Sequence, residues 1–563
     1  EFRRVLFRSG MKKLKMLGCV GLLLALTACQ AGTGNSADSN KAAEQKIAIS
    51  SEAAISTMEP HTAGDTTSTL VMNQVYEGLY VLGKEDELEL GVAAEEPAIS
   101  EDETVYTFKI REDAKWSNDD PVTANDFVYA WQQVASPKSG SIHQALFFDV
   151  IKNAKEIALE GADVNTLGVK ALDDKTLEIT LERPTPYLKS LLSFPVLFPQ
   201  NEKYIKEQGD KYATDAEHLI YNGPFKLKEW DNASSDDWTY EKNDTYWDAE
   251  KVKLTEAKVS VIKSPTTAVN LFDSNELDVV NKLSGEFIPG YVDNPAFLSI
   301  PQFVTYFLKM NSVRDGKENP ALANNNIRKA LAQAFDKESF VKEVLQDQST
   351  ATDQVIPPGQ TIAPDGTDFT KLAAKKNNYL TYDTAKAKEF WEKGKKEIGL
   401  DKIKLEFLTD DTDSAKKAAE FFQFQLEENL DGLEVNVTQV PFTIRVDRDQ
   451  TRDYDLELSG WGTDYRDPLT VMRIFTSDST LGGVTFKSDT YDQLIQETRT
   501  THAADQEARL NDFAQAQDIL VNQETVLAPI YNRSISVLAN QKIKDLYWHS
   551  FGPTYSLKWA YVN

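Results

Sequence analysis

Strand-like and helix-like segments alternate in the second half of the chain. Apolar residues at every second position predict strands over 404–408, 433–440 and 454–458. Between these strands, apolar residues at helical spacing predict helices over 414–430 and 442–452. Strands that alternate with helices of this length are typical of βαβ units, so the chain is predicted to be an α/β protein.

The first half of the chain follows the same pattern. Thr123 and Asp126 form a capping-box-like helix start, because each side chain can accept from the backbone N–H of the other residue. We find no internal repeat and no long low-complexity run. Apolar periodicity predicts strands over 46–50, 104–110 and 175–181, and helices over 69–79 and 124–135.

Composition excludes several kinds of partner. The 563 residues include 61 Lys plus Arg and 88 Asp plus Glu, for a formal net charge of −27. Nucleic acids and anionic lipid surfaces bind clustered positive charge, so neither is an expected partner of the body of the protein. At roughly 100–200 residues per domain, the length corresponds to two to four domains or to one large split domain. The only cysteines are Cys19 and Cys29, so no disulfide framework or cysteine-based metal site is expected elsewhere.

The N-terminus reads as a sorting signal. Residues 1–10 precede a methionine and are interpreted as a cloning scar. Residues 11–28 resemble a secretory signal peptide, with three lysines followed by an apolar stretch too short to span a bilayer. The Leu-Thr-Ala before Cys29 resembles the bacterial lipoprotein processing site, which implies cleavage before Cys29 and lipidation of its thiol. The alternative is an ordinary cleavage site beside an unmodified cysteine. Residues 29–45 are rich in small and polar residues and are predicted to be a flexible tether.

Seven short motifs occur along the chain. They are Glu59-Pro60-His61, Tyr76-Glu77-Gly78-Leu79, the run from Ala114 to Trp131, Asn222-Gly223-Pro224-Phe225, Asn243-Asp244-Thr245-Tyr246-Trp247, Ile327-Arg328-Lys329-Ala330 with Phe335-Asp336, and Gly460 to Pro468. In this order and with the lipoprotein-like N-terminus, they resemble the oligopeptide-binding lipoproteins of bacterial ABC peptide importers, the extracellular solute-binding protein family 5. The resemblance runs from near residue 46 to the C-terminus.

The resemblance implies a two-lobed, periplasmic-binding-protein-like fold of class II, of the large peptide-binding type. In such a fold two lobes close on a ligand, and one lobe is discontinuous and carries an extra inserted subdomain. Within the inserted subdomain, Trp116 and Trp131 are expected to be packing residues. Mapped onto this chain, the first lobe would comprise 46–76, 200–302 and 533–563, the inserted subdomain 77–199, and the second lobe 303–532.

The resemblance also implies a function. The chain would be an extracytoplasmic, lipid-anchored receptor that binds short peptides between its lobes and delivers them to the permease of an ABC transporter, whose ATPase subunits hydrolyse ATP. The expected location is the outer face of a single cell membrane, as in Gram-positive bacteria, and a monomer is expected. A dedicated receptor for one signalling or cell-wall peptide, or a receptor for a metal chelate or another solute, stays open.

The motif that begins at Gly460 carries the predicted ligand contacts. In the resembling family, an aspartate at the position of Asp464 receives the α-ammonium of the peptide, and the backbone before it pairs with the ligand. This assigns Gly460, Trp461, Gly462 and Thr463 to the backbone contact, and glycine lets another backbone approach closely. The alternative is that Asp464 caps a turn before Asp467-Pro468 and that Trp461 is a core residue.

Three further segments are weaker candidates. Gly64, Asp65 and Thr66 lie at the family's spacing for a second backbone contact, or they form a polar loop before a helix. Tyr306 and Tyr531 are candidate aromatics of the cleft, or core residues. Arg448 and Arg452 precede the Gly460 motif, but neither is assigned to a peptide's C-terminal carboxylate. Peptide length is therefore left open.

Other functional classes have little support in the sequence. No H-E-x-x-H or G-x-S-x-G motif occurs, and the five histidines are scattered, so the chain is not expected to be an enzyme. No cofactor and no directly bound transition metal are expected, because no local cluster of ligands is visible. A purely adhesive lipoprotein would not need an ammonium acceptor in the Gly460 motif.

Overall fold

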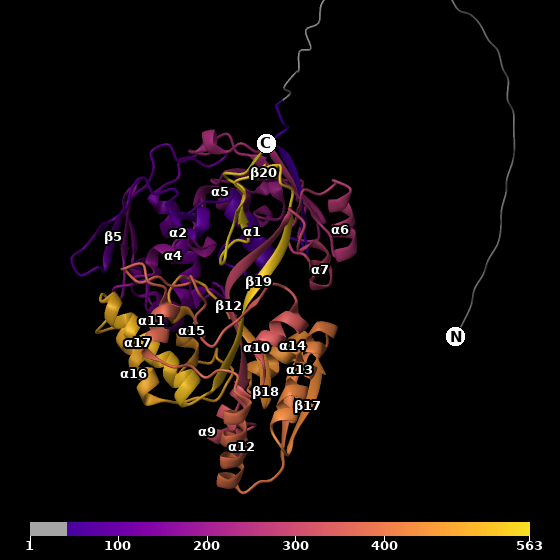
Figure 1. The fold of residues 1–563 in the computed structure, drawn as a ribbon. Coiled ribbons are helices and arrows are strands. Elements are labelled where there is room, and N and C mark those ends of the chain that lie inside the picture. The colour runs from indigo at the N-terminus through magenta and orange to yellow at the C-terminus, as the bar shows by residue number, and fades with distance from the viewer. Residues whose placement is uncertain (1–41) are drawn as a thin grey trace, which may run out of the picture. The chain divides into compact units, whose positions relative to one another are not determined.

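The computed structural model describes residues 42–563 (Figure 1). The predicted cloning scar, the signal peptide, Cys29 and most of the tether lie outside the described residues. Residues 44–563 form one compact unit. Within 42–563, no helix is long and apolar enough to cross a membrane.

One large mixed sheet organises this unit, and its two longest strands, β12 and β19, are antiparallel neighbours at its centre. In Figure 1 they run side by side from the part coloured indigo and magenta to the part coloured orange. The sheet has eleven strands, and the short strand β15 (Thr350–Ala351) pairs with β19 outside the main order. The main order is β17 (Leu433–Val440), β16 (Ile403–Asp410), β18 (Leu456–Gly462), β12 (Phe297–Met310), β19 (Leu527–Ala539), β11 (Val279–Val280), β1 (Lys46–Ser51), β10 (Glu256–Val261), β9 (Asp237–Lys242) and β8 (Phe225–Lys228).

The predicted βαβ units are present in the second half of the chain. Strand β16 is parallel to both β17 and β18, with α13 (Asp413–Asn429) and α14 (Phe442–Gln450) as the connecting helices. Helix α13 packs Phe422 into a hydrophobic core that also contains residues of α9 (Asn325–Gln333) and α12 (Thr384–Ile398). This confirms the α/β prediction.

Strand β18 ends later than the sequence predicted. The apolar pattern predicted a strand over 454–458, whereas the strand comprises Leu456–Gly462 and therefore contains two glycines of the Gly460 motif. The extension is due to pairing with β12, in which Tyr306 lies opposite Gly460 and Val304 opposite Gly462. A partner strand stabilises glycine in an extended conformation that its own propensity does not favour.

Helix α1 (Thr66–Val75) is shifted from the predicted range of 69–79. It begins earlier because the Asp65 side chain accepts a hydrogen bond from the backbone N–H of Ser68 and caps the helix. It ends earlier because Tyr76 is extended. Strand β1 confirms the prediction for 46–50 and pairs in parallel with β10.

A separate four-stranded sheet packs against α2 (Ala124–Ala135), the helix that ends the strongest family motif. This helix has the predicted bounds, and the Thr123–Asp126 capping box is present. Trp116 and Trp131 are buried, and Trp116 Nε1 donates to Asp126 at 2.9 Å, so both tryptophans are packing residues as predicted. The strand order is β4 (Ala98–Ile99), β5 (Val105–Lys109), β7 (Thr176–Thr180) and β6 (Val169–Asp173).

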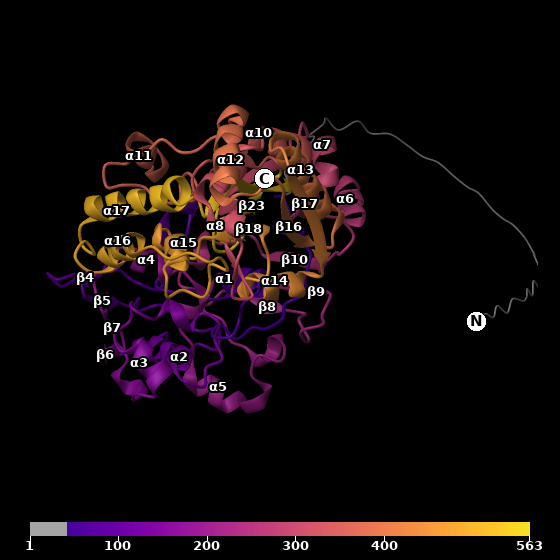
Figure 2. The ribbon, with the colours of Figure 1, turned by 90° about the horizontal axis from the view of Figure 1, so that it is seen from below.

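The region around this sheet contacts helices from much later in the chain. Figure 2 shows α4 (Leu188–Leu191) close to α15 (Leu469–Met472) and α16 (Asp489–Arg499). Hydrogen bonds from Arg466 to Ser190 and from Arg183 to Arg499 join these regions. Helix α16 packs against α17 (Gln506–Asp518), and buried residues of both helices belong to the same hydrophobic core as α2. The Gly460 motif comprises the end of β18 and the segment that leads to α15, close to this contact.

Candidate functional site

Strand β18 has an open edge at the Gly460 motif. On one side, residues 456–462 pair with β12 along their whole length. On the other side, β16 pairs only with Leu456 and Glu457, and no other strand of residues 42–563 continues that pairing. Gly460–Gly462 therefore has backbone groups on this side that an extended chain could pair with.

The side chains around this edge fix the strand and leave room beside it. An added Cβ on Gly460 would lie 2.8 Å from the ring of Tyr306, so only glycine fits there without a shift of the ring. Trp461 Nε1 donates to the carbonyl of Thr470 at 3.1 Å, and the indole is partly buried rather than a core residue. Gly462 is exposed, and the N–H of Thr463 donates to the carbonyl of Phe303 at 3.0 Å.

Asp464 lies directly beyond the end of β18. Its backbone N–H donates to Thr470 Oγ1 at 3.0 Å, and its Oδ2 accepts from Arg473 Nη2 at 3.3 Å. The side chain is 37% exposed. Burial raises the pKa of the Asp464 carboxyl, and the charges of Arg473 and protonated His143 oppose part of that rise. Only one carboxylate oxygen has protein partners, so the other can accept from a ligand.

Asp464 does not cap the turn that follows it. The turn before α15 is capped by Asp467, whose Oδ1 accepts from the N–H of Leu469 at 3.0 Å. Asp467 is also buried in a bidentate ion pair with Arg509, at 2.8 and 3.0 Å. The alternative role considered for Asp464 therefore belongs to Asp467.

In the segment Gly64-Asp65-Thr66, backbone groups rather than side chains are available to a ligand. The Asp65 carboxylate is occupied, because it caps α1 and accepts from the hydroxyl of Ser56. Thr66 is the first residue of α1. Among residues 42–563, the N–H groups of these three residues have no protein acceptor, and Gly64 is exposed. The side chains therefore act as the polar-loop alternative expects, while the backbone N–H groups can bind a ligand.

His143 links this segment to Asp464, and sequence reasoning missed it. His143 Nε2 lies 2.8 Å from the carbonyl of Ala63, and the ring packs edge-on against Phe194 with centroids 5.0 Å apart. Burial lowers the pKa of His143, and the Ala63 carbonyl and the charge of Asp464 oppose part of that fall. The charge of Asp464 therefore acts on an imidazole that contacts the loop before Asp65. No motif marked His143, since its partners are distant in sequence.

Tyr306 and Tyr531 form a parallel stack, with ring centroids 4.7 Å apart and planes at 3°. Tyr531 is 6% exposed and belongs to the core that contains Phe422. Tyr306 is only partly buried, and its second face lies against Gly460. Of the two predicted aromatics, Tyr306 is the one that borders the open edge. Of the two arginines considered nearby, Arg448 is engaged with Glu406 and Asp453.

The residues after Asp464 reach the region of the four-stranded sheet. The ring of Tyr465 stacks on Tyr187, with centroids 4.2 Å apart. The backbone N–H of Arg466 donates to Ser190 Oγ at 3.0 Å, and its guanidinium donates to the carbonyls of Gly359 at 2.6 Å and Asp86 at 3.3 Å. Residues within the Gly460 motif therefore join two regions of the fold.

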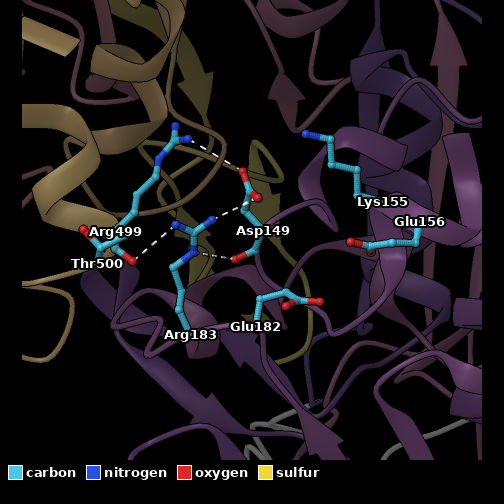
Figure 3. A pocket seen from close by; sticks show the side chains of 7 residues that line it. All are labelled: Asp149, Lys155, Glu156, Glu182, Arg183, Arg499 and Thr500. Carbon is cyan, nitrogen blue, oxygen red and sulfur yellow. Dashed lines mark hydrogen bonds and ion pairs between the residues drawn. The ribbon is translucent and has the colours of Figure 1, made fainter. Parts of the chain in front are cut away.

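A charged cavity of about 280 Å³ lies at the same contact (Figure 3). Figure 3 shows the Asp149 carboxylate between two guanidinium groups, 2.9 Å from Arg183 and 3.7 Å from Arg499. Arg183 Nη1 also donates to the carbonyl of Arg499 at 3.2 Å. None of the predicted site residues lines this cavity, which is bounded by Asp149, Lys155, Glu156, Glu182, Arg183, Arg499 and Thr500.

Comparisons with known proteins identify the relatives of this chain. Residues 87–483 match the model of the bacterial extracellular solute-binding proteins, family 5. A dipeptide-binding protein of Lactococcus lactis is 32% identical over 98% of this chain and all of that protein. The structure of Listeria monocytogenes OppA bound to peptide is 40% identical over 92% of this chain and 99% of that one, with a TM-score of 0.76. The structure of the pheromone receptor PrgZ is 34% identical over 92% of this chain and 100% of that one, also with a TM-score of 0.76. These likenesses confirm the predicted two-lobed fold class.

Proposed function

Because the chain belongs to family 5 of the bacterial extracellular solute-binding proteins, we propose that it is a receptor that binds short peptides for a bacterial ABC importer. The names of its relatives support this proposal, since one is a dipeptide-binding protein and another was solved with a bound peptide. In this role the chain binds its ligand and does not convert it. ATP is hydrolysed by other subunits of the importer.

The observation that carries the proposal is the open edge of β18 at Gly460–Gly462, which ends at the carboxylate of Asp464. An extended peptide adds a strand to such an edge through its own N–H and C=O groups, which every peptide has. The α-ammonium of the peptide then reaches Asp464, where a hydrogen bond to a charged group contributes about 1.5–3 kcal/mol. This mode of binding depends on the main chain and accepts many side chains.

We place the opposite wall of the cleft at Gly64–Thr66, where three backbone N–H groups have no protein acceptor. His143 supports this wall through the carbonyl of Ala63. Tyr306 borders the cleft at Gly460, while Trp461 and Thr463 contribute backbone. Tyr531 supports Tyr306 from the core.

The proposed lobes are those of the family pattern. The first lobe comprises 46–76, 200–302 and 533–563, the inserted subdomain 77–199, and the second lobe 303–532. Strands β12 and β19 then connect the lobes and act as the hinge. The contacts of Tyr465, Arg466 and Arg499 with residues of the inserted subdomain belong to the closed state.

The proposed setting is the extracytoplasmic face of a cell membrane. Lipidation at Cys29 would anchor the chain, and residues 29–45 would be the tether. The closed, loaded form would be presented to the permease subunits. A monomer is sufficient for this role, because both walls of the cleft come from one chain.

A dedicated receptor for one signalling peptide is the second candidate. The likeness to the pheromone receptor PrgZ, which matches this chain as well in fold as the Listeria protein does, favours it. Both candidates use the same cleft and differ only in the ligands accepted. Native mass spectrometry of the purified protein, followed by sequencing of released peptides, separates them. A mixture of peptides supports a general receptor, and one dominant peptide supports a dedicated receptor.

A thermodynamic cycle tests the ammonium contact. We expect Asp464→Asn to weaken binding of a free peptide by about 10- to 150-fold, because the charged acceptor is lost. Acetylation of the peptide's N-terminus should weaken binding to the wild type by a similar factor and have little further effect on the variant. Isothermal titration calorimetry measures all four affinities.

The matched control for this cycle is Glu428→Gln. Glu428 is exposed and makes no hydrogen bond or ion pair within the described residues. It lies in the proposed second lobe and has the same charge as Asp464, so its loss should leave affinity unchanged. If acetylation of the peptide weakened binding to Asp464→Asn as much as binding to the wild type, the assignment of Asp464 would be contradicted. If no peptide bound the wild type, the proposed function would be contradicted.

A further inference from the structure

Three potential metal ligands meet where α16 and α17 join. Glu497 lies in the last turn of α16, His502 in the connection, and Asp512 in the middle of α17. One ligand atom from each lies within 4.8 Å of the other two. His502 Nδ1 and Asp512 Oδ2 are 2.6 Å apart. We propose that Glu497, His502 and Asp512 form a binding site for a divalent transition-metal ion of the zinc type.

The donor set selects the class of ion. Zinc binds imidazole nitrogen at about 2.0–2.1 Å and carboxylate oxygen at about 2.0–2.2 Å, whereas magnesium and calcium prefer oxygen ligands only. Tetrahedral ligands at these lengths are about 3.4 Å apart. The His502–Asp512 pair would therefore open slightly, and Glu497 would move inward. A water molecule would complete the coordination.

The surrounding contacts hold the ligands in position before an ion arrives. The backbone N–H of His502 donates to the carbonyl of Glu497 at 2.9 Å, which fixes the connection. Gln493 Nε2 donates to Glu497 Oε1 at 3.1 Å and orients that carboxylate. Asp512 has a side chain only 7% exposed, and in the described part of the chain its carboxylate has one hydrogen-bond partner, His502. The neighbouring Arg509 is engaged by Asp467 instead.

Among the described residues, a second histidine–aspartate pair, Asp215 and His218, lacks the third ligand that Glu497 supplies at the proposed site. His218 Nδ1 lies 2.7 and 2.8 Å from the two carboxylate oxygens of Asp215. This pair is as short as the His502 pair, but within the described residues no third ligand joins it. The Asp215 carboxylate also caps the backbone N–H groups of Glu217 and His218. His218 is therefore a matched control for an ion pair without a metal site.

The proposed metal site lies beside the charged cavity of Figure 3, so a bound ion would affect the residues that line that cavity. Arg499 and Thr500 lie between Glu497 and His502 and line the cavity of Figure 3. The Arg499 guanidinium contacts Asp149, and its carbonyl accepts from Arg183. A bound ion would tie the end of α16 to α17 beside this contact. Amide groups of residues 498–505 should then exchange hydrogen more slowly.

Zinc titration of the full chain tests the proposal. Isothermal titration calorimetry compares the wild type with Glu497→Gln, His502→Ala, Asp512→Asn and the control His218→Ala. Other zinc-binding groups, including Cys19 and Cys29, are the same in all five proteins. We expect Glu497→Gln to weaken one class of site by about tenfold or more, and His502→Ala to remove it. The His218 variant should match the wild type.

Hydrogen exchange and thermal unfolding with and without zinc give a second readout. The wild type should show zinc-dependent protection of residues 498–505, and Glu497→Gln should lose it. Asp512 is buried, so its variant can lose stability for other reasons, whereas Glu497 is accessible and keeps the test valid. Equal zinc affinity in the wild type, Glu497→Gln and His502→Ala would overturn the proposal. The proposal would also be overturned if His502→Ala lowered the stability while zinc left the stability of the wild type unchanged. The proposal does not depend on peptide binding.

Discussion

At the scale of single residues, Asp464 combines a raised pKa with a proposed role that needs its charge. Burial raises the pKa of this carboxyl in the free protein, and an ammonium ligand would lower the pKa again in the complex. Linkage then requires affinity to be fully present above the raised pKa and to fall as the pH drops through it. The loss should begin at a higher pH than the usual aspartate value of about 4 allows.

Calorimetric titration with a neutral-side-chain peptide between about pH 7 and pH 4 measures this dependence. The wild type should lose affinity across the range, and Asp464→Asn should have low affinity with a much flatter profile. His143 and Arg473 are the charged neighbours of Asp464. Burial lowers the pKa of His143, so its imidazole gains a proton at a lower pH than an ordinary histidine does. If peptide affinity fell in the same way toward acidic pH in both proteins, the pH dependence would be due to another group.

The residue scale also shows what sequence can and cannot predict. The Gly460 motif identified Asp464 because the motif is contiguous. His143 could not be found in this way, since it contacts the carbonyl of Ala63, eighty residues away. The identity of the turn cap was also ambiguous, because Asp464 and Asp467 are both close to Pro468 and only the fold assigns the cap to Asp467.

At the scale of elements, the two glycines of β18 differ in how much space a side chain would have. An added Cβ on Gly460 would lie 2.8 Å from the Tyr306 ring, while one on Gly462 would meet Val304 at an ordinary 3.6 Å. We expect Gly460→Ala to lower the free energy of unfolding by about 1–3 kcal/mol, because the ring must leave its stack on Tyr531. Gly462→Ala should be close to neutral for stability. Urea unfolding measures both.

The same pair of variants separates stability from binding. Gly460→Ala should weaken peptide binding as well, since a displaced Tyr306 would disturb the open edge. The two variants add the same methyl group to the same strand, so each controls for the other. Equal effects on unfolding would show that the Tyr306 contact does not constrain Gly460.

Element boundaries were predictable where their causes are local. Helix α2 was predicted with its observed bounds, because the capping box of Thr123 and Asp126 lies within the helix start itself. Strand β17 was also predicted with its observed bounds. Strand β18 was not, because its end depends on pairing with β12, about 150 residues earlier in the chain. Nonlocal pairing is the part of strand formation that propensity does not describe.

At the scale of the whole molecule, the contact of Asp149 with Arg499 is a test of closure, because it joins the proposed inserted subdomain to the proposed second lobe. If it exists only in the closed state, its loss shifts the population toward the open state and weakens ligand affinity by the same free energy. Partly exposed ion pairs contribute about 0.2–1 kcal/mol, so Asp149→Asn should speed peptide release by about 1.5- to 5-fold. Stopped-flow dissociation measures the rate.

Asp149 has a positive φ of 61°, and asparagine tolerates this conformation well, so the variant should keep the local backbone. Glu156→Gln is the control, because Glu156 lines the same cavity and makes no side-chain hydrogen bond or ion pair. Equal release rates in all three proteins would show that this contact does not favour the closed state.

The proposed arrangement of the lobes rests on the family resemblance. The alternation of strands and helices predicted βαβ units, but it does not say which segments share a lobe. That information lies in pairings such as Ile49 with Val279 and Val279 with Ala539, which join the beginning, middle and end of the chain. No periodicity in a single segment encodes such pairings.

These pairings have a consequence for how the protein is made. Strand β1 emerges from the ribosome early, yet the sheet around it needs β19, and Gln45 exchanges two hydrogen bonds with Val562. We therefore expect the N-terminal part of the sheet to stay incomplete until synthesis has nearly ended. If the chain is exported unfolded, as the predicted signal peptide implies, this order of folding helps export, because the sheet cannot be completed before the C-terminal segment is available.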